Sequence, residues 1–245
     1  MKKMIIVSLF MLCLGFVVTA MSDEKLVYKV KRTSEKIYID GNITEEDWKA
    51  AQSVGDFVFP WYKEGKKEQT DARMLWDDEF LYVLFKCEDE HISAHYFERN
   101  SAPYKDDCVE VFISPNSKNP IWYVNNEFNC LGTWLIGFHK GDIRGENYVE
   151  RDKILIGRSH KGTINKENDI DEYWILEIGI PFESLRDYEG QLPPRPGDSW
   201  GLDLNRCGGD VNPQYSQWSP SKTEQPDFHR PQDFGKIIFS GETVR

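Results

Sequence analysis

The chain has 245 residues and a formal net charge of −11 at pH 7, from 30 Lys and Arg against 41 Asp and Glu. A surface of that sign repels the phosphate backbone of nucleic acids and anionic membranes, so neither is an expected partner. A neutral ligand is compatible with this composition.

Residues 1–20 are typical of a secretory signal peptide. Met1–Lys3 is a short basic start, an apolar run extends from Met4 to Val18, and small residues end at Ala20, the expected cleavage point. The run is shorter than the roughly 20 apolar residues of a membrane-spanning helix. We therefore expect export to the periplasm, the exterior or the cell surface, without insertion in the membrane after cleavage. Loss of the two lysines changes the net charge from −11 to −13.

Residues 21–245 have the rhythm of one all-β domain. Short runs rich in β-branched and aromatic residues recur between Asp, Asn, Gly and Pro, with no repeat or long linker. This pattern predicts an antiparallel β-sandwich of jelly-roll type. Strands are expected, in chain order, at Tyr28–Arg32, Lys36–Asp40, Asp71–Trp76, Phe80–Cys87, Cys108–Ser114, Ile121–Asn129, Gly132–Phe138, Trp174–Ile180, Ser199–Arg206 and Gly235–Phe239.

One or two short helices complete the predicted elements. Thr44 is placed to cap a helical turn over Glu45–Trp48, whose acidic residues suit the positive end of a helix. Trp48 and Ala51 would then face the sandwich. Pro181 ends the preceding strand and can open a second short helical turn.

Four cysteines follow the signal segment: Cys87, Cys108, Cys130 and Cys207. No two of them form a CxxC pair, and their spacing matches no zinc-binding template. Export permits disulfides, and four cysteines allow three pairings, while buried free thiols are the alternative. If one bridge forms, we prefer Cys87 with Cys108, because both lie on predicted core strands.

Several segments, taken in order, resemble the family-9 carbohydrate-binding modules and their wider relatives. Ile39–Trp48 resembles the opening strand, glycine turn and tryptophan-bearing helix of that family, Leu75–Val83 its signature hairpin, and Asp106–Ile113 its acidic core strand. No single motif is specific, but the ordered set is strong. The likeness continues through Asn129–Thr133, Ile178–Phe182, Trp218–Pro220 and Phe228–Gly235.

The resemblance implies a β-sandwich that holds a sugar between aromatic rings and performs no catalysis itself. The ligand would be a mono- or oligosaccharide or the end of a polysaccharide. The resemblance also implies a role in carbohydrate catabolism and frequent company with glycan-degrading enzymes. Structural calcium is known in such modules, but no Asp-x-Asn-x-Asp-Gly loop is present here to place it.

A pyranose has an apolar C–H face and a rim of hydroxyls, so its site needs flat aromatic surface and planar polar groups. Trp61 and Trp218 lie in loop-like stretches and are the candidates for stacking on the sugar. The alternative for both is a loop residue packed on the core. The tryptophans in helix or strand patterns are interpreted as core residues: Trp48, Trp76, Trp174 and Trp200.

Polar candidates surround the acidic strand. Arg99 and Tyr104 precede it, where the family has an arginine and an aromatic residue, although Arg99 could instead pair with the acids that follow. Asn129 and Arg206 are further ligand candidates, and each could as easily hold a turn. Glu110 alternates with apolar residues, so its buried carboxylate needs a partner. We expect Arg99 or Arg206 in that role, with Glu110 supporting the site.

Two other functions stay open from the sequence. A glycoside hydrolase uses two carboxylates about 5–9.5 Å apart, and the densest acidic group is Asp106, Asp107 and Glu110. No GxSxG, HExxH or Cys–His signature supports other catalysis. Haem binding, which relatives of this sandwich show, needs axial Met, His or Lys ligands. The candidates are Met21, Met74, His91, His95, His139, His160 and His229.

Overall fold

A computed structural model describes residues 25–116, 118–146, 153–166 and 168–244. The expected signal peptide, residues 1–20, lies outside this part of the chain. Among the described residues, every helix is too short or too polar to cross a membrane.

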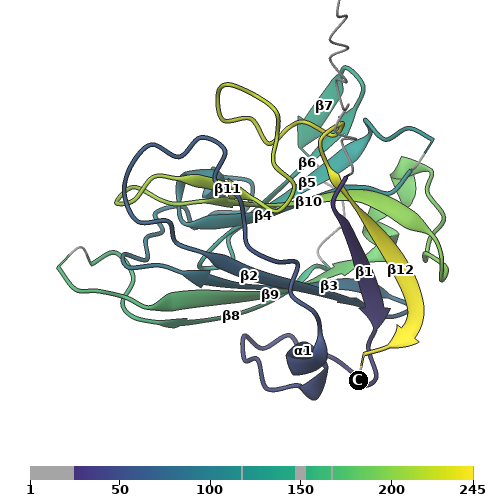
Figure 1. Cartoon of the computed structure of the whole chain (residues 1–245), viewed down its shortest axis with the longest axis horizontal. Coiled ribbons are helices and arrows are strands. Elements are labelled where there is room, and N and C mark those ends of the chain that lie inside the picture. The colour runs from purple at the N-terminus through teal and green to yellow at the C-terminus, as the bar shows by residue number, and fades with distance from the viewer. Residues whose placement is uncertain (1–24, 117, 147–152, 167, 245) are drawn as a thin grey trace, which may run out of the picture.

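Over the described residues, twelve strands form one continuous sheet that folds back on itself into two layers (Figure 1). Their order is β7-β6-β5-β4-β10-β12-β1-β2-β3-β9-β8, and β11 pairs with β10. The bounds are β1 Val27–Arg32, β2 Thr70–Trp76, β3 Phe80–Glu88, β4 Cys108–Ser114, β5 Tyr123–Asn129, β6 Trp134–Lys140, β7 Ile143–Glu146, β8 Leu155–Lys161, β9 Tyr173–Pro181, β10 Ser199–Cys207, β11 Tyr215–Gln217 and β12 Gly235–Thr243.

The two layers confirm the predicted all-β sandwich. One layer contains β4, β5, β6 and β10, the other contains β2, β3, β8 and β9, and β1 and β12 join them at one side (Figure 1). Most pairings are antiparallel as predicted, but β1 runs parallel to both β12 and β2. The predicted strand at Lys36–Asp40 is wrong, because backbone N–H groups there donate to the side chains of Glu45 and Glu177 instead of to a neighbouring strand. No strand was predicted at β7, β8 or β11.

Three short helices are present in the described part of the chain: α1 Glu46–Ala50, η1 Pro103–Lys105 and η2 Phe182–Tyr188. The predicted helix near Trp48 is therefore confirmed, but its cap is not Thr44. Glu45 occupies the N-cap position, and no side chain bonds to the free backbone N–H groups there. The 3₁₀-helix η2 follows Pro181 as predicted.

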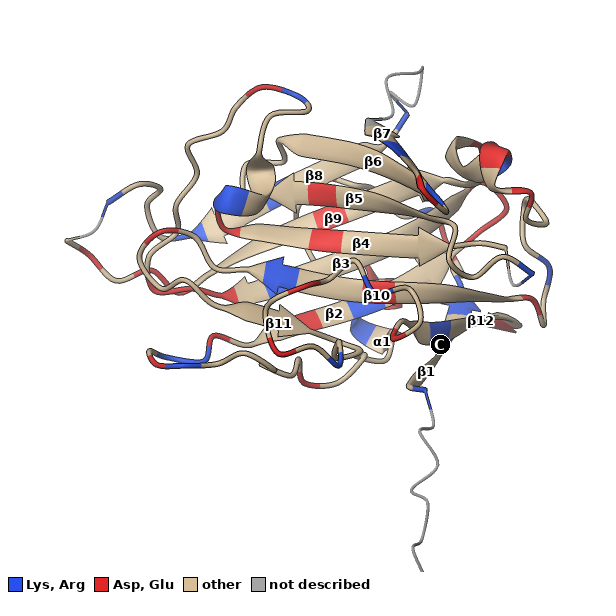
Figure 2. Cartoon of the chain, turned by 90° about the horizontal axis from the view of Figure 1, so that it is seen from above, with Lys and Arg blue, Asp and Glu red and all other residues tan. Residues whose placement is uncertain are grey.

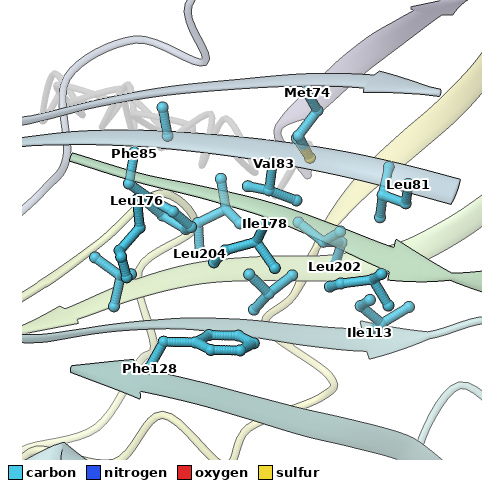
Figure 3. Close-up of a cluster of buried hydrophobic side chains, with 14 of the residues drawn as sticks. Met74, Leu81, Val83, Phe85, Ile113, Phe128, Leu176, Ile178, Leu202 and Leu204 are labelled. Carbon is cyan, nitrogen blue, oxygen red and sulfur yellow. The ribbon is translucent and has the colours of Figure 1, made fainter. Parts of the chain in front are cut away.

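The core lies between the two layers, where alternate side chains of facing strands meet (Figure 3). Met74, Val83 and Ile178 come from one layer, and Ile113 and Leu204 come from the other; all five are fully buried. Each such side chain contributes about 1.5–3 kcal/mol by leaving water. The interpretation of four tryptophans as buried residues is also confirmed: Trp48, Trp76, Trp174 and Trp200 are at most 3% exposed.

Residues 34–51, which we call the strap, cover the outer face of the β3–β9 layer. Trp48 of the strap packs there with Leu84 and Ile175 in a second buried cluster. At Gly41 the backbone has a φ of +86°, and a Cβ atom would lie 2.3 Å from the backbone of Arg158. Only glycine allows the strap to approach β8 this closely.

The cysteines do not form the preferred bridge. Cys87, Cys108, Cys130 and Cys207 are all free and buried. Cys87 lies in the core between the layers, whereas Cys108 belongs to a cluster on the outer face of β4. Cys108 lies opposite Cys207 in the β4–β10 register, so these two are the neighbouring pair.

Candidate functional site

A cleft of about 410 Å³ opens on the outer face of the β4–β5 layer. Its volume lies within the roughly 300–1,000 Å³ that is usual for small-molecule sites. Glu110 of β4 and Glu127 of β5 lie directly opposite each other in the strand register, and Figure 2 shows acidic residues side by side on these strands. The lining residues are Tyr104, Glu110, Glu127, Cys207, Tyr215, Pro226, Asp227, Phe228 and His229.

Aromatic rings form the rim of this cleft. Tyr104 comes from η1, which packs over β4 and β5, and Tyr215 comes from β11, beyond β10. The two tyrosines are 44% and 41% exposed, so both are accessible to a ligand. Phe228 is buried and supports Tyr215 edge-on, with ring centroids 5.9 Å apart. The rim thus offers flat apolar surface of the kind that packs against a sugar face.

The two glutamates form the floor and are only partly satisfied. Glu110 is 3% exposed and Glu127 is 5% exposed. Glu127 Oε1 accepts a hydrogen bond from Asn125 Nδ2 at 2.7 Å, and Glu110 Oε1 accepts a long contact from Cys207 Sγ at 3.7 Å. Within the described residues, the second oxygen of each carboxyl group has no partner. A buried polar atom without a partner is costly, so both oxygens are disposed to bind a ligand donor.

Burial and mutual repulsion change the acidity of this pair. Burial raises the pKa of Glu127 to about 7. Burial and the neighbouring charges of Glu127 and Asp203 raise the pKa of Glu110 well above its usual value. Like charges this close disfavour double ionisation, so the pair retains a proton near neutral pH. It can then both accept and donate hydrogen bonds.

Three packed rings, those of Tyr123, His139 and His229, lie at one side of the cleft. Tyr123 stacks on His139 with centroids 4.3 Å apart and planes 3° from parallel. The Tyr123 hydroxyl lies 2.9 Å from Nδ1 of His229, a lining residue of the cleft. Burial, aided by His229 and Arg144, lowers the pKa of His139 to about 4, so this ring is neutral near pH 7.

Of the residues proposed from sequence, Tyr104 and Glu110 line the cleft. The prediction that Arg206 pairs with Glu110 is wrong, because Arg206 projects from the opposite face of β10. Arg206 is 1% exposed, pairs with Asp89 at 3.1 Å and lies 3.8 Å from Glu68. It neutralises buried acids between the layers and has no surface for a ligand.

Asn129 and Trp218 also have structural positions. Asn129 is fully buried, and its Nδ2 donates to Asp106 at 2.8 Å, while its Oδ1 accepts from the backbone of Thr133 at 2.9 Å. It therefore holds the β5–β6 turn. Trp218 is 3% exposed and packs edge-on against Tyr28 in the main core. Neither placement fits the predicted ligand role, since neither side chain reaches an open surface.

Trp61 and Arg99 lie outside the cleft. Trp61 is half-buried and packs on Phe228, and it lines a neighbouring cleft of about 420 Å³. The two clefts share Tyr215 and Pro226. Arg99 is exposed, and its guanidinium lies 4.0 Å from the ring centroid of Trp134. The described residues that line the first cleft thus include neither member of the predicted stacking pair and no arginine.

Seven lining residues were missed from sequence. Glu127 had a signal, because Asn125, Glu127 and Asn129 alternate along a predicted strand and place polar groups on one face. The others lie at a strand end or in segments whose approach to the sheet no local pattern reveals: Cys207, Tyr215, Pro226, Asp227, Phe228 and His229.

Other proposed chemistry finds less support. Among the described residues, no three His, Cys, Asp or Glu side chains gather as a metal-binding group. Asp106 and Asp107 accept backbone N–H groups of His95 and Ser93, at 2.8 Å and 2.6 Å, and so brace loops. The cavity beside His91 and His95 is only about 70 Å³, far below the roughly 300 Å³ of small ligand sites. That volume leaves no room for haem.

Comparison with known families identifies the domain. Residues 42–239 match the model of carbohydrate-binding family 9. The chain belongs to this family. The match covers the second part of the strap, both layers and the cleft.

Relatives of this family-9 chain include parts of larger enzymes. It is 27% identical over 208 residues to endo-1,4-beta-xylanase A of Thermoanaerobacterium saccharolyticum. The aligned region covers 83% of this chain but only 15% of the enzyme. It is 28% identical over 208 residues to exoglucanase XynX of Acetivibrio thermocellus, covering 83% of this chain and 16% of that protein. The chain therefore spans only a small part of these relatives.

Solved structures share the fold. The crystal structure of a protein from Bacteroides uniformis aligns with a TM-score of 0.75 at 22% identity, covering 89% of this chain and all of that one (100%). A family-9 module from Caldicellulosiruptor kristjanssonii, solved in complex with glucose, aligns with a TM-score of 0.58 at 17% identity, covering 89% and 98% of the two chains.

Proposed function

We propose that this protein is a non-catalytic carbohydrate-binding protein and that the cleft over Glu110 and Glu127 holds a pyranose unit. The observation that carries the proposal is the pairing of exposed aromatic rings with buried, unpartnered carboxyl oxygens in one cleft. The family membership and the glucose complex of a module with the same fold support it.

The cleft matches the two surfaces of a sugar ring. Tyr104 and Tyr215 supply flat apolar surface for the C–H face, and the glutamate floor supplies acceptors for hydroxyl groups. Water competes for each of these hydrogen bonds, so each contributes only about 0.5–1.5 kcal/mol, or up to about 3 when a charge is involved. The expected affinity is therefore weak to moderate.

The geometry of the acid pair favours binding over hydrolysis. A glycosidase places its two carboxyl groups on either side of the scissile bond. Glu110 and Glu127 instead project side by side from neighbouring strands, from one floor of the cleft. Both would meet the same side of a sugar, which suits recognition. We expect no release of reducing sugar from polysaccharides.

We further propose that the protein is exported and acts together with glycan-degrading enzymes. Export, carried by the signal-like residues 1–20, would bring the protein to polysaccharides outside the cytoplasm. The family-9 relatives are parts of a xylanase and an exoglucanase, which supports company with glycan-degrading enzymes in carbohydrate catabolism.

The neighbouring cleft offers a place for a second sugar unit. Tyr215 and Pro226 line both clefts, and Trp61 lines the second one only. A chain of sugars that passes over Tyr215 would bring its next unit towards Trp61. Trp61 thus keeps a proposed role in ligand binding, as a contact for oligosaccharides rather than for monosaccharides.

A calorimetric titration after a glycan array tests the proposal. Tyr215→Ala should weaken the affinity for the best array ligand about tenfold, because stacking on one aromatic ring contributes about 1–1.5 kcal/mol. The matched control is Tyr38→Ala, an equally large change at a tyrosine that is 60% exposed and lies in the strap. An unchanged affinity in Tyr215→Ala, or no saccharide ligand on the array, would contradict the proposal.

A further inference from the structure

The cleft is lined by acidic groups without a matching cation. Among the lining residues, within the part of the chain that the structure describes, there is no Lys or Arg, whereas Glu110, Glu127 and Asp227 are all present. Asp203, beneath the same face, is a further buried acid that acts on Glu110. A neutral sugar offers these acids no positive charge, whereas a cation in the cleft favours their ionised form.

Within the described part of the chain, two buried oxygens of this cluster lack a hydrogen-bond partner. Oε2 of Glu110 and Oε2 of Glu127 have no partner among the described residues, although each side chain is at least nine-tenths buried and lines the cleft. A cationic N–H donor would satisfy both oxygens at once, with charge-assisted bonds about twice as strong as those from a hydroxyl group. The observation thus points to a positively charged donor on the ligand.

The rim is suited to the same charge. Tyr104, Tyr215 and Phe228 present aromatic rings around the acid pair. The faces of aromatic rings attract a cation, by about 0.5–2 kcal/mol, and do so most when water is excluded. An ammonium group carried on a pyranose therefore meets carboxyl groups below, whose ionisation it favours, and rings around it.

We infer that the cleft prefers a sugar with a protonated amine, such as a 2-amino-2-deoxy pyranose, over a neutral sugar, and that it rejects a sugar carboxylate. The inference rests on the proposed saccharide site and names the chemical class of its ligand. Glu110 and Glu127 are the residues that determine this specificity.

Rejection of acidic sugars follows from the same residues. A uronate would place its carboxylate in a buried site whose floor is already acidic, and no lining Lys or Arg is available among the described residues to pair with it. Like charges at such a distance are strongly unfavourable where water is excluded. Anionic sugars should therefore bind much more weakly than neutral ones.

Calorimetry at pH 6.5 with matched β-1,4-linked ligands tests the inference. The ligands are the glucosamine disaccharide, its fully N-acetylated form, cellobiose and a disaccharide that ends in glucuronic acid. We expect the free amine to bind about tenfold tighter than cellobiose, since charged hydrogen bonds add about 1–1.5 kcal/mol over neutral ones. The acetylated form should lose this gain, and the uronate should bind at least tenfold more weakly than cellobiose.

Variants assign the preference to the acid pair. Glu127→Gln and Glu110→Gln should each retain binding of cellobiose and reduce the tenfold gain for the amine to threefold or less. Glu46→Gln, which removes the same charge from α1 at a side chain that is 86% exposed, should leave the gain intact.

Two results would overturn the inference and are distinguishable from failure of the saccharide site itself. Equal affinities for the amine and for cellobiose would overturn the specificity and leave the saccharide site standing. A gain that persists in both Gln variants would remove Glu110 and Glu127 from it. If no disaccharide binds the folded protein, the proposed function fails, and the inference fails with it.

Discussion

The two outer faces of the sandwich each bury glutamate, but they treat it differently. On the β3–β9 layer, Glu177 lies under the strap. Its Oε1 accepts from Trp48 Nε1 at 2.8 Å, and its Oε2 accepts from the backbone N–H groups of Asp40 and Gly41 at 3.0 and 2.6 Å. On the β4–β5 layer, Glu110 and Glu127 each retain an oxygen without a partner among the described residues.

This difference separates a structural carboxylate from the two for which we propose a role in binding. Glu177 takes the place of a strand partner for the strap, whose backbone crosses β8 too closely for a ladder. Glu110 and Glu127 receive no such cover, and the chain leaves a cleft above them. Burial alone does not distinguish the two roles, because all three glutamates are buried. They differ in how many carboxyl oxygens have a hydrogen-bond partner.

The largest effect is expected from Glu177→Ala. The change leaves three donors without an acceptor, two of them buried and one part-buried. Each buried donor costs about 1–3 kcal/mol, so we expect a loss of about 3–5 kcal/mol in the free energy of unfolding. Urea denaturation measures it. Saccharide affinity of the folded variant should not change. A loss below 1 kcal/mol would show that the strap does not depend on Glu177.

A smaller effect is expected from pH. Burial raises the pKa of Glu127 to about 7, above its value of about 4.3 in an unfolded chain. Between these values the folded state binds more protons than the unfolded state, so stability falls as pH rises from 5 to 8. Each pKa unit corresponds to about 1.4 kcal/mol, which gives about 3 kcal/mol at most.

Thermal unfolding at pH 5 and pH 8 measures this dependence. The expected midpoint is several degrees higher at pH 5. In Glu127→Gln, which cannot ionise, the difference between the two pH values should be smaller, and the variant should be the more stable protein at pH 8. Identical pH profiles for the two proteins would show that Glu127 ionises freely in the folded state.

The smallest effect is expected from Asn125→Ala. Asn125 Nδ2 donates to Glu127 at 2.7 Å, and its Oδ1 lies 3.0 Å from His139 Nε2. Its loss should cost about 1 kcal/mol of stability, the net value of a typical hydrogen bond, and about threefold in saccharide affinity, because Glu127 is no longer held in one orientation. Calorimetry and urea denaturation measure the two quantities; an unchanged affinity would mean that Glu127 needs no such support.

Most strands were predictable because their patterns are local. Cys108–Ser114 alternates apolar residues over one face, and the structure has β4 at those bounds. The order of the strands was not predictable in the same way, because the parallel pairing of β1 with β12 joins residues over 200 positions apart. The strand predicted at Lys36–Asp40 is absent for a related reason, since its backbone bonds to the side chains of Glu45 and Glu177.

The site was harder to predict than the fold. Loop tryptophans are expected at sugar sites, but Trp218 enters the core beside Tyr28. Whether a loop tryptophan is exposed depends on which layer its loop covers, and the residue type does not specify that. Glu110 was found because a carboxylate on a core-like strand is unusual. Its true neighbour, Glu127, depends on the β4–β5 register, which the sequence leaves unspecified.

The parallel pairing of β1 and β12 also has a mechanical consequence. Val27 lies opposite Lys236, and Arg32 lies opposite Thr243, so the chain enters this strand pair at one end and leaves it at the other. A tension applied between the two termini would therefore pull β1 and β12 in opposite directions along their length. The hydrogen bonds between them would share the load in shear and would not open one after another. A domain stretched between its two ends would resist unfolding by this arrangement.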